Sequence, residues 1–144
     1  MLGRGQNIAN ASPPIVMFRG DNLLTPFTRD SEWNEGGNWS LDTTLERAEV
    51  DTFFGTQDLD HNVADLEAGA KYRLQIYLED GFTLSSPYIQ IDLGDAAGTG
   101  QATLNTAGYN YFILTAGAAN TTLNIRAQDN SVANIKHVAL FKQF

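Results

Sequence analysis

Acidic residues are the first candidates for chemistry, because hydrolysis of a glycosidic bond needs two carboxyl groups held roughly 5 to 9.5 Å apart. The strongest candidates are Glu46, Glu49 and Asp51, followed by Glu32 and Glu35. Side chains alternate along a β-strand, which would place Glu49 and Asp51 on one face together. Nothing near them in the sequence indicates the burial that shifts a carboxyl pKa. We therefore interpret them as a charged surface rather than an acid–base pair.

Nucleophilic catalysis has no recognisable motif in this chain. His61 and His137 are the only histidines, cysteine is absent, and no Gly-x-Ser-x-Gly turn is present. No glycine-rich loop that could cradle a phosphate follows a strand and opens a helix. We therefore predict that the protein is not an enzyme.

The segment Asp58–Asn62 places oxygen-bearing side chains at alternate positions, an arrangement that can point several ligands at one hard cation. The rest of the helix–loop–helix calcium motif is missing, because its sixth position is Val63 instead of Gly and its twelfth is Gly69 instead of Glu. Two histidines without cysteine also make a poor zinc site. We predict a solvated turn, no metal site and no cofactor, and calcium is the one ion left open.

Two tryptophans, Trp33 and Trp39, are the residues best suited to contact a sugar, because a flat ring can stack on the apolar face of a pyranose. Tyr77, Tyr88 and Gln90 are the expected companions, since alternation places them on outward strand faces. The alternative is that the tryptophans pack in the core and that exposed tyrosines anchor a protein interface.

The formal net charge of −8 is unevenly distributed. Residues 21–69 hold twelve acidic and two basic residues, whereas residues 70–144 hold five of each. Such an acidic segment repels phosphate, so nucleic acid is not an expected partner. The chain also lacks eighteen consecutive apolar residues and an apolar run typical of a signal peptide, so neither a membrane span nor secretion is expected.

Short apolar segments separated by turn residues predict an all-β protein. The clearest strand is Lys71–Glu79, where inward Tyr72 and Leu74 alternate with outward Arg73. The other expected strands are 22–27, 39–43, 45–54, 87–93, 100–104, 109–115, 121–127 and 132–142. The only stretch that could form one or two helical turns is Asp58–Ala68. We predict a jelly-roll β-sandwich of about eight to nine antiparallel strands, one domain over residues 21–144.

An extended N-terminal arm is predicted over residues 1–20, because Pro13 and Pro14 force extended backbone before the apolar run Ile15–Phe18. We expect the arm to bind a partner chain, although Ile15–Phe18 could instead be the first strand of the domain. The segment Tyr109–Leu114 is apolar on both faces, which predicts that a loop, an arm or a subunit covers it. The predicted partner-binding residues of the arm are Arg4, Ile15, Val16, Met17, Phe18 and Arg19.

Three stretches in order resemble jelly-roll carbohydrate-binding modules and the related domains of bacteriophage virion proteins. They are Asn22–Leu24 with Trp33, Gly36, Gly37 and Trp39, then Asp65–Leu74, and finally Gly108–Phe112 with Thr115–Gly117 and Ile135–Leu140. The resemblance implies the fold over about residues 22–142. Family members often have an Asp, a ligand of structural calcium, at the place that Lys136 occupies here, which argues against that calcium site.

This resemblance implies a virion structural protein, most simply a bacteriophage capsid decoration or cement protein. Such a protein would bind the major capsid protein or other virion proteins and stabilise the shell by burying surface across subunit seams. We would then expect a homo-oligomer, with a trimer as the first guess, synthesised in the host cytoplasm and located on the capsid surface. The alternative is a lectin-like carbohydrate-binding module, or a head or tail fibre domain that contacts host glycans.

Overall fold

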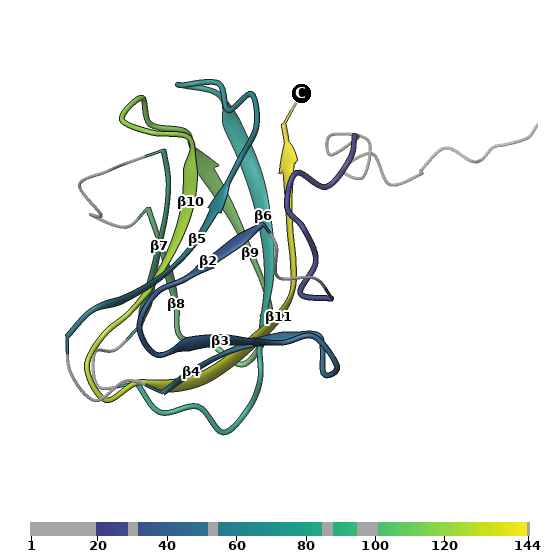
Figure 1. Cartoon of the computed structure of the whole chain (residues 1–144). Helices are drawn as coiled ribbons and strands as arrows, with labels where there is room; N and C mark the ends of the chain where they lie inside the picture. Colours follow the sequence, from purple (N-terminus) through teal and green to yellow (C-terminus); the bar gives the residue numbers. More distant parts are fainter. Residues whose placement is uncertain (1–19, 29–31, 52–54, 85–87, 95–100, 144) are drawn as a thin grey trace, which may run out of the picture.

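The computed structural model describes residues 20–28, 32–51, 55–84, 88–94 and 101–143. Within these ranges all regular secondary structure is β, in ten strands (Figure 1). The strands are β2 (Trp33–Glu35), β3 (Trp39–Asp42), β4 (Arg47–Asp51), β5 (Gln57–Asn62), β6 (Lys71–Leu78), β7 (Ile89–Leu93), β8 (Ala102–Leu104), β9 (Gly108–Thr115), β10 (Thr122–Ala127) and β11 (Val132–Lys142). Among the described residues no helix is long and apolar enough to cross a membrane.

The strands form two antiparallel sheets of five, which confirms the predicted all-β sandwich. The first sheet has the order β2-β5-β10-β7-β8 and the second the order β3-β4-β11-β6-β9. In the second sheet β3 and β4 lie across one end of the molecule, whereas β6, β9 and β11 run towards the other (Figure 1). Most neighbours within a sheet are distant in sequence, so each sheet is assembled by long-range pairing.

The core lies between the sheets and follows the period-two alternation expected of strands that bury one face. In β6 the residues Tyr72, Leu74, Ile76 and Leu78 are buried, whereas Lys71 and the odd-numbered positions after it face outward. Neighbouring strands of the same sheet place further core side chains beside these, such as Leu140 of β11 next to Leu74 of β6. The odd-numbered face of β6 is therefore an outer surface of the sandwich.

The solvated turn predicted at Asp58–Asn62 is wrong, and Asp58–Ala68, which could have supplied at most one or two helical turns, forms none. Residues 57–62 form β5, which pairs along its whole length with β10, for example Leu59 opposite Ile125. The buried positions Leu59, His61 and Val63 have the spacing of a strand and not of a helix. Acidic residues between them hid this alternation, because both strand and loop accept polar residues at outward positions.

A β-bulge interrupts β11 at His137, where the pairing register with β6 shifts between Lys136 and Ala139. His137 has a φ of 53°, and it is exposed, whereas the next residue, Val138, is buried. A bulge re-aims side chains at the position where the extra residue is inserted. Here it turns an imidazole onto the outer face of the second sheet.

The described chain begins at Gly20, beside β11. The N–H of Leu23 donates to the carbonyl of Leu140 at 2.9 Å, and the Leu140 N–H donates to Oδ1 of Asn22 at 2.9 Å. β4 pairs only with Val132–Lys136 of β11. Residues 22 and 23 thus occupy the same side of β11 near Leu140, beyond the end of β4. Residues 1–19 of the predicted arm lie outside the described residues.

Candidate functional site

A group of aromatic side chains lies on the outer face of the second sheet, where β6, β9 and β11 adjoin. We call Tyr77, Tyr109, Tyr111 and His137 the tyrosine cluster. The register places Tyr77 of β6 directly opposite Tyr109 of β9, and Gln75 opposite Tyr111. The bulge of β11 adds His137 from the other side of β6. Three strands that are distant in sequence therefore build one surface.

The rings of the cluster contact one another. Tyr77 meets Tyr109 edge-on, with ring centroids 4.9 Å apart, and meets His137 at 5.7 Å. The Tyr109 ring is nearly parallel to that of Tyr111, at 6.3 Å and an interplanar angle of 14°, and lies 5.9 Å from that of His137. Edge-to-face and offset pairs of this kind stabilise aromatic side chains relative to one another. The cluster is therefore partly pre-organised.

The cluster is open to solvent. Tyr109 and Tyr111 are each 52% exposed, and their neighbour on the same strand face, Ile113, is 51% exposed. The guanidinium carbon of Arg73 lies 4.6 Å from the centroid of the Tyr111 ring, a cation–π contact. The outward side chains Tyr109, Tyr111 and Ile113 of β9 thus form an apolar area beside the cationic side chain of Arg73.

Beyond Tyr77 the same face becomes charged. Glu79 accepts from Arg47 Nη1 at 3.1 Å and pairs with Lys136 Nζ at 2.7 Å, and Arg47 Nε also donates to Glu49 at 2.6 Å. The hydrogen bond from Lys136, opposed by some desolvation, holds the pKa of Glu79 below its ordinary value of 4.5. These ion pairs link β4, β11 and the residue that follows β6 next to the cluster.

A polar hollow of about 300 Å³ continues this face over β3, β4 and β11. Its lining contains amide, hydroxyl, carboxylate and guanidinium groups, which can donate to and accept from hydroxyl groups of a ligand. The lining residues are Asn38, Ser40, Arg47, Glu49, Val50, Asp51, Val132 and Asn134. The outer face of the second sheet therefore combines exposed rings with hydrogen-bonding groups, the combination found in sites that bind amphipathic ligands.

Trp33 and Trp39 are buried core residues, at 6% and 3% exposure, and this corrects their expected role as stacking surfaces. Trp33 Nε1 donates to the carbonyl of Thr25 at 2.8 Å, and Trp39 Nε1 donates to that of Gln57 at 3.0 Å. Trp33 also packs against Phe27 and His61. Each indole thus fills the interior and satisfies a backbone carbonyl, as the alternative interpretation expected.

The other predicted sugar-contacting residues are divided between the two sheets. Tyr77 belongs to the tyrosine cluster, whereas Tyr88 immediately precedes β7 and Gln90 lies on β7, in the first sheet. Gln90 lies opposite Arg126 of β10, which forms an ion pair with Asp58 at 2.8 Å. The structure therefore does not bring Tyr88 and Gln90 to Tyr77.

Sequence reasoning missed three members of the cluster: Tyr109, Tyr111 and His137. The signal was present in part, because 109–114 is apolar on both faces, but that pattern was assigned to a covered strand rather than to an exposed site. Local sequence could not show that His137 would turn outward, since the bulge depends on how β11 pairs with β6. The predicted partner-binding residues Arg4, Ile15, Val16, Met17, Phe18 and Arg19 lie outside the described residues.

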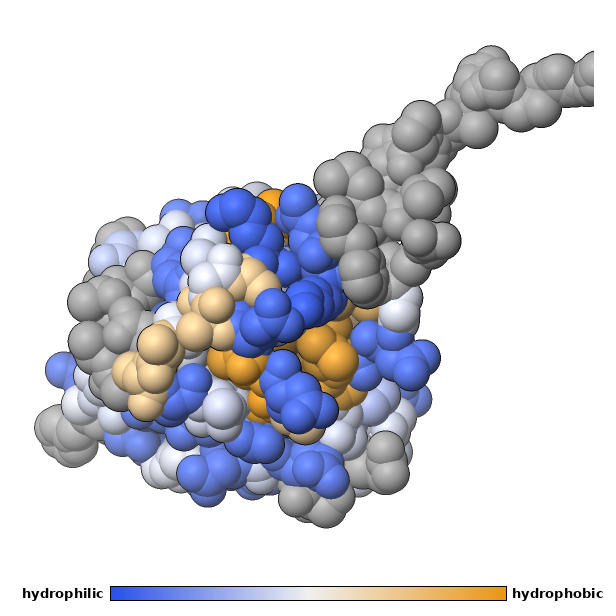
Figure 2. Space-filling model, turned by 90° about the horizontal axis from the view of Figure 1, so that it is seen from above, coloured by the Kyte–Doolittle hydropathy of each residue, from blue (hydrophilic) through white to orange (hydrophobic). Residues whose placement is uncertain are grey.

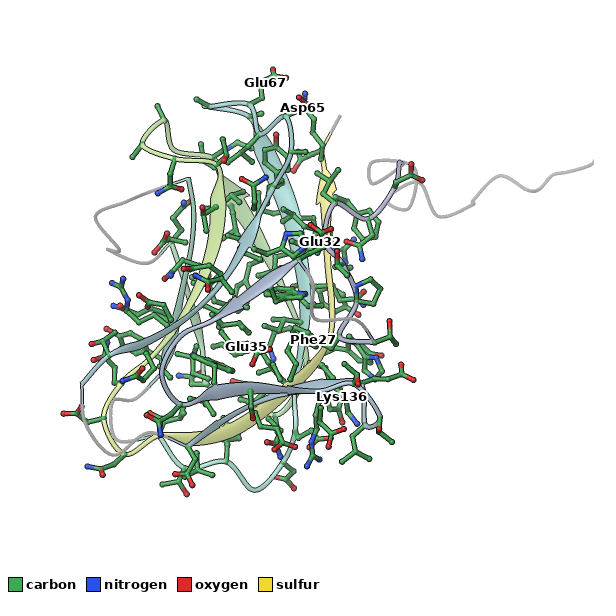
Figure 3. The ribbon with its side chains drawn as sticks, viewed as in Figure 1. Phe27, Glu32, Glu35, Asp65, Glu67 and Lys136 are labelled. Atoms are coloured by element: carbon green, nitrogen blue, oxygen red, sulfur yellow. The ribbon has the colours of Figure 1, made fainter. Side chains whose placement is uncertain are left out.

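The structure also shows how the candidate metal positions are used. Asp58 pairs with Arg126, and Asp60 accepts from Asn124 Nδ2 at 2.5 Å, so both belong to the outer face of the first sheet. Lys136 pairs with Glu79. Lys136 lies far from Asp65 and Glu67, which are at the opposite end of the sandwich (Figure 3). No group of three or more His, Asp or Glu in the described ranges could hold a metal ion.

A second hollow, of about 460 Å³, opens near the end that carries Asp65 and Glu67 and is lined in part by Asn22, Glu32 and His61. Seen from that end, hydrophilic side chains surround a small apolar area (Figure 2). His61 is buried and both of its ring nitrogens have backbone partners. The imidazole of His61 is therefore already engaged by the backbone in this hollow.

Comparisons with known proteins identify the fold. No family model and no curated protein matches the chain. Two variants of a family 29 carbohydrate-binding module, studied for ligand recognition, match 85% of this chain and 90% and 89% of theirs, at 12% and 11% identity and a TM-score of 0.54 for both. The enzymatically active domain of tailspike protein 4 of bacteriophage CBA120 matches 88% of this chain at 12% identity and a TM-score of 0.50.

The chain spans only about a fifth of that tailspike chain, because the match covers 21% of its length. The carbohydrate-binding modules, in contrast, match over nearly their whole length. At these identities the likeness establishes the fold and not the ligand. The chain therefore has a β-sandwich fold like that of a carbohydrate-binding module.

Proposed function

We propose that the chain is a glycan-binding domain and that the tyrosine cluster is its sugar-contacting surface. The observation that carries this proposal is the exposure of Tyr109 and Tyr111, each about half open to solvent, on the outer face of β9. Contiguous exposed apolar side chains rimmed by polar groups mark binding surfaces on soluble proteins. The proposal moves the site away from the buried tryptophans and keeps only Tyr77 of the residues expected from sequence.

The chemistry of the face suits a sugar better than a purely apolar ligand. A pyranose presents apolar C–H surface and a rim of hydroxyl groups, so it needs both ring contact and hydrogen bonds. The rings supply the first, while Gln75, Arg73 and Lys136 beside them carry amide, guanidinium and ammonium donors. The shared fold of the carbohydrate-binding modules supports the same assignment.

Binding of the full chain to a panel of soluble oligosaccharides and polysaccharides, measured by calorimetry, tests the proposal. Tyr109→Ala and Tyr111→Ala should each weaken binding by about thirtyfold, the effect of losing about 2 kcal/mol at a central aromatic contact. Tyr88→Ala, on the other sheet, and Leu45→Ala, equally exposed at 51% but on the loop after β3, are matched controls that should bind normally. Equal binding by all four variants, or no binding by the unmodified chain to any glycan, would contradict the proposal.

We also propose that the domain binds without catalysis. The acidic residues that could have formed a catalytic pair are instead engaged or exposed: Glu49 is paired with Arg47, and Asp51 and Glu46 are exposed. A glycan that binds should therefore be recovered unchanged after long incubation. Release of new reducing ends, abolished by Glu49→Gln, would show that a hydrolase was missed.

A virion role is a second proposal, favoured by the match of the fold to a segment of a bacteriophage tailspike chain. In that setting the tyrosine cluster would contact polysaccharide at the surface of the host. Selective binding to bacterial surface polysaccharides in the panel supports this setting, and binding only to other polysaccharides contradicts it. The capsid decoration role depends on residues 1–20, so it predicts that their deletion abolishes capsid binding while the sandwich stays folded.

A further inference from the structure

Strand β9 forms one margin of the second sheet. The carbonyl of Lys71 accepts from the Gln143 N–H on the β11 side of β6. Backbone groups of successive residues point to opposite sides of a strand, so those of Arg73, Gln75 and Tyr77 also point towards β11. The even-numbered residues of β6 therefore pair with the even-numbered residues of β9.

It follows that the odd-numbered residues of β9 direct their N–H and C=O groups away from the sheet. The Thr115 N–H confirms this direction, because it donates to Oε1 of Gln101, which is not part of β6, at 3.0 Å. For Tyr109, Tyr111 and Ile113 no partner for these outward groups is found in the part of the chain that the structure describes. Tyr109, Tyr111 and Ile113 thus each offer one backbone N–H donor and one C=O acceptor at this margin.

This margin lacks the features that usually prevent strand pairing between molecules. Proteins protect an exposed edge with charged residues, Pro or bulges. None of these is present in β9, whose sequence from Gly108 to Thr115 is GYNYFILT. Its outward side chains Tyr109, Tyr111 and Ile113 are instead large, apolar and half exposed. The edge therefore suits pairing with another strand.

The distribution of charge permits a second copy of the chain to supply that strand. The acidic residues of β3 and β4 lie in the two strands on the opposite side of the same sheet, four and three positions from β9. The charged outward residues of β6, the strand beside β9, are the basic Lys71 and Arg73. Two copies can thus approach through β9 without bringing their acidic strands together, despite a net charge of −8 on each.

The outward positions are also self-complementary about a two-fold axis. If Tyr111 of one copy lies opposite Tyr111 of the other in an antiparallel pair, Tyr109 of each copy lies opposite Ile113 of its neighbour. All three positions then exchange both backbone hydrogen bonds with the facing residue. The facing side chains form an aromatic–aromatic pair and two aromatic–β-branched pairs, which are favourable cross-strand neighbours.

We propose that two copies of this chain associate through antiparallel pairing of their β9 strands about a two-fold axis at Tyr111. The second sheets of the two copies then form one continuous sheet, and the two tyrosine clusters lie side by side on its outer face. If the tyrosine cluster binds glycans as proposed, the dimer is the unit that binds a long glycan, and residues from both copies form one site.

The test is the mass in solution over a concentration series, by sedimentation equilibrium, for the full chain and edge variants. The unmodified chain should reach twice the mass of one chain. Ile113→Pro should remain monomeric and folded, because it removes only an outward N–H and leaves the bonds between β9 and β6 intact. Leu45→Lys, on an equally exposed residue at the far margin, is the matched control and should dimerise normally.

A pair of charge variants fixes the register. Tyr111→Lys and Tyr111→Glu should each be monomeric, because like charges then face each other across the axis. Their equimolar mixture should form a heterodimer. A monomeric unmodified chain, a trimer, or an Ile113→Pro variant that still dimerises would overturn the proposal.

Glycan binding is measured separately on the monomeric Ile113→Pro variant, which retains Tyr77, Tyr109 and Tyr111. Binding of short oligosaccharides should be unchanged in that variant, whereas binding of long chains should weaken through loss of the second site. An unmodified chain that stays monomeric but binds oligosaccharides therefore refutes only the pairing proposal. A stable dimer that binds no glycan refutes only the proposed function.

Discussion

The backbone N–H of Thr25 donates a hydrogen bond to Nε2 of His61 at 3.0 Å, which joins the segment before β2 to β5. The other ring nitrogen, Nδ1, lies 2.7 Å from the carbonyl of Asn62 and must donate to it. His61 is buried, and it packs 4.7 Å from Trp33. The ring is therefore held in its neutral form, protonated at Nδ1 alone.

The first prediction is that His61 makes the stability of the fold sensitive to mild acid. Desolvation lowers the pKa of His61 below its ordinary value of 6.5, although the Asn62 carbonyl and Glu32 oppose this. A histidine with a lowered pKa contributes stability that is complete above pH 6.5 and is lost as the pH falls towards the folded value. The thermal midpoint should therefore fall below pH 6.5. His61→Gln should flatten this dependence, since its amide oxygen can accept the Thr25 bond, whereas His137→Gln, at an exposed site, should not.

The second prediction separates the structural tryptophans from the proposed site. Trp39→Phe removes the donor to the Gln57 carbonyl and leaves space in the core, and should cost about 2 to 3 kcal/mol of unfolding free energy. Chemical denaturation would measure this loss. Glycan affinity of the folded variant should be unchanged, because the indole is 3% exposed and cannot contact a ligand. A stable Trp39→Phe variant with impaired binding would restore the tryptophan hypothesis.

The fold was predictable because its strands carry local alternation. In Lys71–Leu78 each buried residue is followed by an outward one, and β11 has the predicted bounds Val132–Lys142. Where alternation was obscured by polar residues, as in Gln57–Asn62, the element was missed. The strand pattern is local information, so it survives without knowledge of the partner strands.

The site was less predictable because it depends on pairing between distant strands. Trp39 and Tyr109 are both aromatic residues of strands, yet one faces the core and the other solvent. Which face is covered follows from sheet order, and the tyrosine cluster exists only because β6 pairs with both β9 and β11. No spacing within the sequence encodes that arrangement.

The third prediction concerns Glu79, which holds Lys136 and Arg47 beside the tyrosine cluster. Its pKa is lowered chiefly by the Lys136 hydrogen bond, so its contribution is present above pH 4.5 and is lost as the pH falls through its folded value. Glu79→Gln should cost about 1 kcal/mol at neutral pH and low salt, and less in high salt. Denaturation at two salt concentrations checks this. Glu35→Gln, an exposed acid on β2, is the control and should have little effect.

The fourth prediction concerns Asp60 and Asn124 on the first sheet. Asp60 accepts from Nδ2 of Asn124, while Oδ1 of Asn124 is buried and has no hydrogen-bond partner. Desolvation raises the pKa of Asp60, with a smaller upward contribution from Asp58, against the lowering effects of the Asn124 bond and of Arg126.

A carboxyl with a raised folded pKa favours folding in acid, and that contribution is lost as the pH rises through the folded value. Asp60→Asn should therefore raise the thermal midpoint at neutral pH and add about 1 kcal/mol to the free energy of unfolding, since the amide can still accept from Asn124 without carrying a half-buried charge. The gain should shrink in acid, where Asp60 of the unmodified protein is protonated. Asp58→Asn should have the opposite sign at neutral pH, because it breaks the ion pair with Arg126. Thermal unfolding of the three proteins at two pH values decides the matter, and a destabilised Asp60→Asn at neutral pH would show that its charge, and not only its hydrogen bond, supports the sheet.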